Sequence, residues 1–305
     1  MRLILAIIAC LVHSGVVHAA DIERRCHSNA PTCIIAFTGE IDKGDAERLT
    51  QALLQPLPSG KSHVAWLEVD SLGGDVTEAL RIGELVRQNM LGVSLLRSAA
   101  IDGPSRAATA DPTPEERVCA SACVLILMSA PARWVRHARI GLHRPRLSAE
   151  FYRQQSPASI ARAHADLDRR VRETVIAGGM PTELIDRMMR YASNELLWLA
   201  GTDLAALDSE APWYQEMQIA VCGASPRVER RSAVAVQAWA KHEVDEGAGN
   251  GAKASEGCGA MIAMREQAKF RAARSAESGA RSVAGTARVT GSTSRAGSRA
   301  GASSN

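Results

Sequence analysis

The chain has 305 residues, of which 46% are hydrophobic and 23% are charged, and its formal net charge is +3. This length and composition allow a buried core of ordinary domain size. Residues 223–305 hold 13 Lys and Arg against 7 Asp and Glu, a net charge of +6, so the remainder carries −3. A basic segment of this kind is more often solvated than bound to an anionic polymer, and we expect no nucleic-acid partner.

Residues 1–20 have the pattern of a cleavable signal peptide. Arg2 supplies the positive start, residues 3–11 the apolar run, and residues 17–19 a small-residue cleavage site. A lipoprotein cleavage site at Cys10 is the weaker alternative, because it comes early and more apolar sequence follows it. No later apolar run reaches about 18 residues. The sequence therefore predicts a periplasmic or secreted protein without a membrane span.

Removing the signal peptide leaves an even number of cysteines, which in an exported chain favours disulfides over metal ligation. Six cysteines allow 15 pairings, and the sequence cannot choose among them. If each cysteine pairs with the next one along the chain, the disulfides are Cys26 to Cys33, Cys119 to Cys123, and Cys222 to Cys258. A zinc site would need a cluster of His and Cys at ligand spacing, which the sequence lacks, so we expect no metal and no cofactor.

The first half of the mature chain alternates between strand and helix patterns. β-Branched apolar runs predict strands, and apolar residues at helical spacing predict amphipathic helices. Strands are expected at 32–41, 64–69 and 93–96, and helices at 42–56 and 76–90. This order predicts an α/β fold with parallel strands joined by right-handed crossovers.

The second half continues with a polar segment, 97–116, that has the composition of an inserted surface loop. Residues 118–130 form an apolar segment that contains Ser121. Further strands are expected at 139–143, 196–199 and 218–221, and helices at 148–177 (long and highly charged) and 181–191. Residues 21–222 thus form one domain. Residues 223–305 are rich in Gly, Ala, Ser and Arg, and such a tail is expected to be disordered because it has little to bury.

Ser121 lies between small residues directly before an apolar run. Small neighbours let backbone approach backbone, and a helix start offers unpaired N–H groups and the positive end of the helix dipole. These are the conditions that a nucleophilic serine needs, because the oxyanion it creates must meet fixed donors. The plainer interpretation is an N-cap serine at the start of a core helix.

Two other features could complete such a site. Gly73 and Gly74 follow a predicted strand, and paired glycines let the backbone turn with positive φ and expose an N–H. His143 ends another strand, at the edge where ligands bind to parallel sheets, and an imidazole can accept a serine proton near neutral pH. Taken singly, the glycines are more often a tight β–α turn and the histidine is more often structural.

Four motifs together resemble the Clp protease proteolytic subunit (ClpP) family, and its exported relatives most, within the ClpP/crotonase superfamily. They occur in the family's order over about residues 33–207: Thr38-Gly-Glu-Ile-Asp42, Asp70-Ser-Leu-Gly-Gly-Asp-Val76, Cys119-Ala-Ser-Ala-Cys123 and Arg139-Ile-Gly-Leu-His-Arg-Pro145. The resemblance implies a ClpP/crotonase-like spiral of β-β-α units with a parallel sheet and a long helical segment.

The resemblance also implies roles for the site residues. Ser121 would be the nucleophile, His143 the general base, and the N–H groups of Gly74 and Ala122 the oxyanion hole. The family's aspartate is absent from its expected place, where Asn194 and Glu195 are the candidates to orient His143. The long 97–116 loop and the cysteines flanking Ser121 also depart from the cytoplasmic peptidase.

The sequence thus predicts an exported, ATP-independent serine hydrolase, most simply a peptidase acting on a peptide or protein. Homo-oligomers are common in the family and are possible here. A non-catalytic ClpP-like binding domain is the alternative, since fold alone does not settle function. A redox protein using Cys119 and Cys123 is weaker still, because the two cysteines lack the spacing of thioredoxin-like sites.

Overall fold

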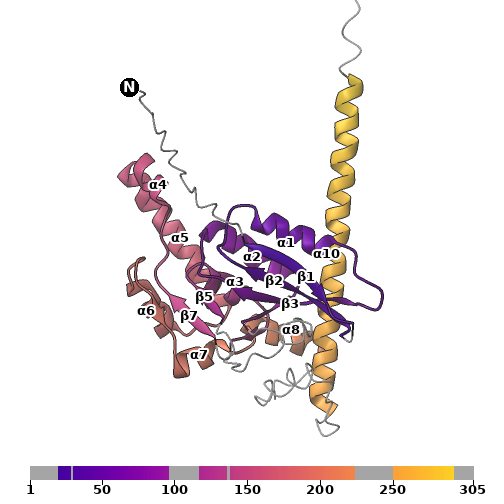
Figure 1. Cartoon of the computed structure of the whole chain (residues 1–305), viewed down its shortest axis with the longest axis horizontal. Helices are drawn as coiled ribbons and strands as arrows, with labels where there is room; N and C mark the ends of the chain where they lie inside the picture. Colours follow the sequence, from indigo (N-terminus) through magenta and orange to yellow (C-terminus); the bar gives the residue numbers. More distant parts are fainter. Residues whose placement is uncertain (1–19, 29, 96–116, 136–137, 224–249, 292–305) are drawn as a thin grey trace, which may run out of the picture.

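The structure is a computed structural model that describes residues 20–28, 30–95, 117–135, 138–223 and 250–291 (Figure 1). The predicted signal peptide, except residue 20, and the predicted inserted loop lie outside these ranges. The described chain has a mixed α/β fold with parallel strands and helices, as the alternating sequence pattern predicts.

The larger sheet has five strands in the order β1-β2-β3-β4-β6. β2, β3, β4 and β6 are parallel to one another, and β1 runs antiparallel to β2 at the edge. Its strands are β1 (Asp21–Cys26), β2 (Thr32–Thr38), β3 (His63–Asp70), β4 (Gly92–Ser94) and β6 (Arg133–Trp134). Crossover helices α1 (Asp45–Leu54) and α2 (Val76–Gln88) join β2 to β3 and β3 to β4, so the expected β-α-β-α-β order is confirmed.

The smaller sheet has the order β5-β7-β8, with β5 (Val118–Ala120) parallel to β7 (Arg139–Leu142) and β8 (Leu197–Trp198) antiparallel to β7. A bridge between Ser71 and Cys119 connects it to the end of β3. Helix α3 (Cys123–Ser129) follows β5 after a two-residue turn, and its residues from Cys123 to Met128 are all buried. α3 contacts α2 and α5, so it is the central helix of the core.

The C-terminal part of the domain is helical, with α4 (Ala149–Gln154), α5 (Pro157–Ala177), α6 (Thr182–Arg190), α7 (Gly201–Leu207) and α8 (Pro212–Cys222). The helix predicted over 148–177 is divided into α4 and α5. Ser156 caps α5 with its side chain, and Pro157 occupies the first turn, where its missing N–H costs nothing.

The strand predicted at 218–221 is wrong, because these residues form the last turns of α8. A short apolar run cannot by itself distinguish a strand from part of a helix. Pro212 begins this helix, and Gly223, with φ +62°, ends it in the left-handed conformation. These two signals identify the helix once they are considered together.

The expectation of a disordered tail is wrong for Asn250–Gly291, which forms helix α10. Figure 1 shows α10 as a long helix beside the larger sheet, extending beyond it. Ile262, Ala263 and Gln267 are buried on the domain, and a disulfide between Cys222 and Cys258 joins α8 to α10. The composition of this segment did not predict a helix, because alanine, which forms helices readily, is mixed with Gly and Ser, which do not.

Gln267 completes the hydrogen bonding of the larger sheet at Val64 of β3, on the side where β4 has not yet begun to pair. Its Oε1 accepts from the Val64 N–H at 3.1 Å, and its Nε2 donates to the Val64 carbonyl at 2.7 Å and to the Asn89 carbonyl at 3.0 Å. β4 begins to pair with β3 only at Trp66. The amide therefore satisfies buried backbone groups that would otherwise lack partners.

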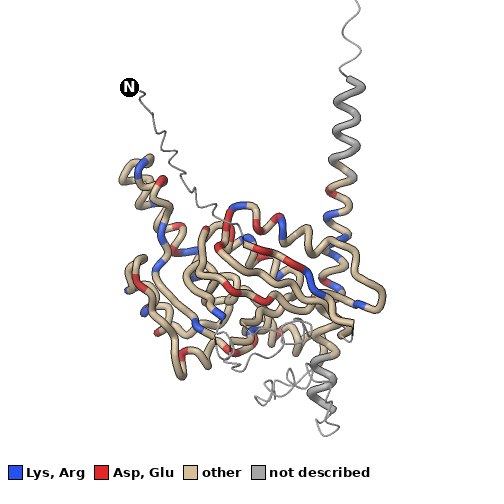
Figure 2. The backbone as a smooth tube through the Cα atoms, viewed as in Figure 1, with Lys and Arg blue, Asp and Glu red and all other residues tan. Residues whose placement is uncertain are grey.

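Figure 2 shows basic and acidic residues interspersed along the described chain. No helix in the described ranges combines the length and apolarity that a membrane crossing needs.

We predict that Gln267→Ala lowers the free energy of unfolding by about 2 kcal/mol, because buried backbone groups lose their partners. Urea denaturation of the full chain measures this change. Lys269→Ala is the matched control on the same helix, since Lys269 is exposed and pairs with Glu266 of that helix, and its effect should stay within about 0.5 kcal/mol. Equal effects of the two substitutions would contradict the proposed docking of α10.

Candidate active site

Ser121 occupies the turn between strand β5 and helix α3. Its φ is +55°, in the left-handed region that residues other than glycine rarely adopt. Its N–H donates to the Gly141 carbonyl on β7 at 2.9 Å, and its carbonyl accepts from the Val124 N–H in the first turn of α3. A strand–turn–helix with a strained serine at the turn is the arrangement that exposes a nucleophile in other hydrolase folds.

Gly73 and Gly74 form the turn between β3 and α2, against the Ser121 turn. Gly73 has φ +105°, and a Cβ placed on it would lie 2.7 Å from the Ser121 Cβ and 3.0 Å from the Ala122 nitrogen. Gly74 has φ +142°, and a Cβ there would lie 2.2 Å from the Ile41 carbonyl oxygen. Glycine is required at both positions, by conformation and by close backbone approach.

Two backbone N–H groups next to this contact, those of Gly74 and Ala122, donate no hydrogen bond to a described residue. Ile41 uses both of its backbone groups around Gly74, because its N–H donates to Gly73 and its carbonyl accepts from Asp75, each at 2.8 Å. Backbone donors that are held rigidly and lack an acceptor can form an oxyanion hole.

His143 follows β7 and is half-buried. Its Nδ1 lies 2.7 Å from the backbone oxygen of Arg144. A carbonyl oxygen can only accept, so the proton of a neutral ring is on Nδ1 and the lone pair is on Nε2. The backbone thus selects the tautomer in which Nε2 can accept a proton.

Ser121 and His143 line the same small cavity, of about 20 Å³, together with Ala122 and Pro145. Its remaining lining is apolar, from Val76 on α2, Val124 and Leu125 on α3, Val171 on α5 and Met188 on α6. No hydrogen bond joins the side chains of Ser121 and His143 in this part of the structure. Such bonds are often long in the unliganded state and shorten when a substrate binds.

The two candidates for a third member lie elsewhere. Asn194 and Glu195 are exposed in the turn between α6 and β8, where the Glu195 N–H donates to the Ala192 carbonyl at 3.0 Å. Neither side chain is hydrogen-bonded to His143 in the described chain. The position of the histidine is set instead by the backbone oxygen of its own neighbour.

The six cysteines of the described residues form three disulfides between successive cysteines: Cys26–Cys33, Cys119–Cys123 and Cys222–Cys258. The middle one connects the residues two before and two after Ser121, and both of its cysteines are fully buried. It therefore closes a short covalent loop around the strained turn. Among the described residues, no group of three or more His, Cys, Asp or Glu side chains is placed to hold a metal ion.

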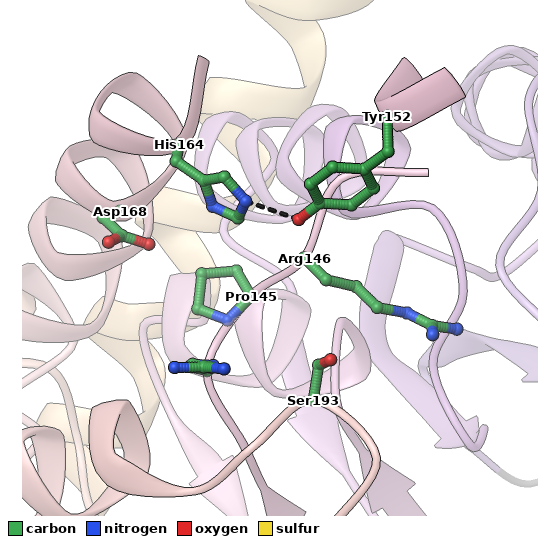
Figure 3. A pocket seen from close by; sticks show the side chains of 7 residues that line it. Pro145, Arg146, Tyr152, His164, Asp168 and Ser193 are labelled. Carbon is green, nitrogen blue, oxygen red and sulfur yellow. Dashed lines mark hydrogen bonds between the residues drawn. The ribbon is translucent and has the colours of Figure 1, made fainter. Parts of the chain in front are cut away.

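A larger cavity, of about 310 Å³, adjoins this site and shares Pro145 with it. Figure 3 shows Tyr152 from α4 and His164 from α5 in contact with each other on one side of it, with Pro145 and Ser193 on the other side. This cavity could not be predicted from the sequence, because its walls come from four places along the chain: the segment after β7, α4, α5 and the turn at Ser193. Only their packing brings these residues together.

No protein-family model matches the chain, and no curated protein matches it either. Among solved structures, the chain is similar to a single-substitution mutant of ClpP1 from Listeria monocytogenes. The two are 19% identical, the match covers 57% of this chain and 86% of that chain, and the TM-score is 0.37. This likeness is too distant to assign a function.

We predict that Gly73→Ala destabilises the protein by about 1–3 kcal/mol more than Gly60→Ala does, because the new methyl group overlaps the Ser121 turn. Gly60 is the matched control: it also has positive φ, +80°, but a Cβ there meets nothing within 4 Å. Urea denaturation of both variants isolates the steric contribution from the conformational one. Equal losses would show that the two turns are not in tight contact.

Proposed function

We propose that this protein is a ClpP-like serine hydrolase that cleaves peptides without ATP. The observation that carries the proposal is the left-handed conformation of Ser121 between β5 and α3, packed against the glycine turn at Gly73. Among the described residues, the N–H groups of Gly74 and Ala122 have no acceptor and can donate to an oxyanion. A serine that served only as an N-cap would adopt extended backbone and bond the second or third helical N–H. Ser121 does neither, since the Val124 N–H donates to its backbone carbonyl.

In the proposed reaction, the Ser121 Oγ attacks the carbonyl carbon of the scissile bond while His143 Nε2 takes its proton. The N–H groups of Gly74 and Ala122 donate to the oxyanion that forms. His143 then gives the proton to the leaving nitrogen, and the C–N bond breaks to leave an acyl-enzyme. Water, deprotonated by His143, hydrolyses the ester and regenerates Ser121.

His143 would act here without a carboxylate partner. The Arg144 carbonyl holds the productive tautomer, as an aspartate does in a triad, but it contributes no full negative charge to stabilise the imidazolium. We therefore expect turnover well below that of a complete triad. The preorganised donors at Gly74 and Ala122 would supply much of the remaining rate enhancement.

The disulfides are compatible with an oxidising compartment outside the cytoplasm. We propose that residues 1–20 direct the protein there. Since ATP does not drive reactions in such a compartment, substrates would be short or unfolded peptides that reach Ser121 without an unfolding partner.

One observation favours a second candidate, a binding domain without catalysis. The cavity shared by Ser121 and His143 has room for about one water molecule, so a substrate must displace side chains to enter it. A peptide could instead bind on the outer surface of the same site.

We expect a fluorophosphonate probe to label the full chain at Ser121, because the probe needs an activated hydroxyl next to an oxyanion hole. Mass spectrometry of the labelled protein locates the adduct, and Ser121→Ala must abolish it. Ser129→Ala is the matched control, because Ser129 lies in the same segment but its hydroxyl donates to the Leu125 carbonyl. Absence of labelling on a protein shown to be folded by circular dichroism would favour the binding domain.

The rate of labelling also tests the proposed base. We predict that His143→Ala slows labelling by about 10²–10⁴-fold, the usual contribution of a general base. Glu195→Gln and Asn194→Ala should change the rate less than about two-fold, because neither side chain contacts His143. A large loss in Glu195→Gln would instead show that this carboxylate moves to His143 during the reaction.

A further inference from the structure

The 310 Å³ cavity that shares Pro145 with the Ser121 site is lined by more basic than acidic side chains. Arg144 and Arg146 line it from the segment after β7, and Asp168 is its single carboxylate. Neither arginine forms an ion pair with another described residue. Two unpaired guanidinium groups thus lie at the rim of one concave site.

Three arginines on the neighbouring helices are paired, whereas Arg153, Arg162 and Arg190 form no ion pair with a described residue. Arg169 bonds Asp166 and Glu173, Arg172 lies 3.7 Å from Asp186, and Arg187 bonds Asp203 at 2.6 Å. What distinguishes Arg144 and Arg146 is that both line the same cavity. Arginine presents a planar set of donors that matches a carboxylate, so an unpaired couple in a cavity favours an anionic ligand of that shape.

A neutral donor lies in the same cavity. The Tyr152 hydroxyl from α4 contacts His164 Nε2 from α5, and the two ring centroids are 5.6 Å apart (Figure 3). This contact fixes the hydroxyl at the wall of the cavity. With the proton of His164 on Nε2, the tyrosine oxygen accepts from the ring and its own O–H remains available to a ligand.

One stretch of chain, residues 143–146, lines both this cavity and the small cavity at Ser121. His143 and Pro145 line the small cavity at Ser121, whereas Arg144, Pro145 and Arg146 line the large one. A peptide whose carbonyl lies at Ser121 would therefore place a neighbouring group in the large cavity. Extended peptide segments project successive side chains in alternate directions, so one side chain can enter it without disturbing the scissile bond.

We propose that this cavity binds a carboxylate of the substrate, and so makes the protein selective for peptides with an acidic group near the scissile bond. The proposal rests on the proposed function in its choice of a peptide as ligand. The carboxylate is either an Asp or Glu side chain or the free end of the peptide. Asp168 opposes this binding, which leaves the site a net charge of +1 with neutral His164.

The test uses the full chain carrying Ser121→Ala, so that binding is measured without cleavage. Four fluorescent hexapeptides, identical except at two points, contain either Glu or Gln and end in either a carboxylate or an amide. Fluorescence anisotropy gives their dissociation constants. We expect the peptides with the relevant carboxylate to bind about ten-fold more tightly than the neutral peptide. The pair that shows the difference identifies the source of the carboxylate.

Two substitutions should change this preference in opposite directions. Arg146→Gln should remove most of it, and Asp168→Asn should increase it, because the competing negative charge is lost. Arg153→Gln is the matched control, since Arg153 is exposed on α4 beside Tyr152 but does not line the cavity. A general charge effect would make Arg153→Gln equal to Arg146→Gln.

Equal affinity for all four peptides, or a preference that Arg146→Gln leaves intact, would overturn the proposal. The experiments distinguish failure of the carboxylate-binding proposal from failure of the proposed hydrolase activity. Fluorophosphonate labelling at Ser121 without any acidic preference contradicts only the carboxylate site. An acidic preference in a protein that the probe does not label supports the site and contradicts the hydrolase.

Discussion

The candidate site depends on the contact between two turns, one at Gly73 and Gly74 and one at Ser121. Both turns have positive φ, and each is held by backbone hydrogen bonds: Ile41, after β2, binds the glycine turn, and Gly141 on β7 binds the serine turn. The two backbones approach so closely that a single methyl group between them would overlap both. Because these hydrogen bonds set the positions of both turns, the glycine turn is held against Ser121.

The rest of the core supports this contact. Helix α3 begins two residues after Ser121 and is buried from Cys123 to Met128. It packs between α5 and α2, the helix that follows the glycine turn. The buried disulfide between Cys119 and Cys123 adds a covalent restraint on the same turn. Strain at one serine is thus stabilised by packing and by a cross-link, which is the usual condition for a strained residue to persist.

His143 shows how a site can be organised without the expected carboxylate. The nearest polar partner of its Nδ1 is a backbone oxygen one residue away, and a carbonyl fixes the tautomer as well as a carboxylate does. Asn194 and Glu195 could not be excluded from the sequence alone, because the path of the turn between α6 and β8 is not a local property. The same segment after β7 then supplies Arg144 and Arg146 to the neighbouring cavity, so one stretch of chain would serve both the proposed chemistry and substrate selection.

The sequence by itself determined the alternation of strands and helices in the first half of the domain, the pairing of small residues around Ser121, and the placement of His143 at a strand end. These are local patterns, since side-chain periodicity and turn chemistry are set by residues a few positions apart. Only the tertiary structure decided that residue 267 completes the hydrogen bonding of residue 64, that Arg144 and Asp168 line one cavity, and that Gly73 lies against Ser121. Such contacts join segments that are distant along the chain, and they are selected by the packing of the whole core rather than by any one segment.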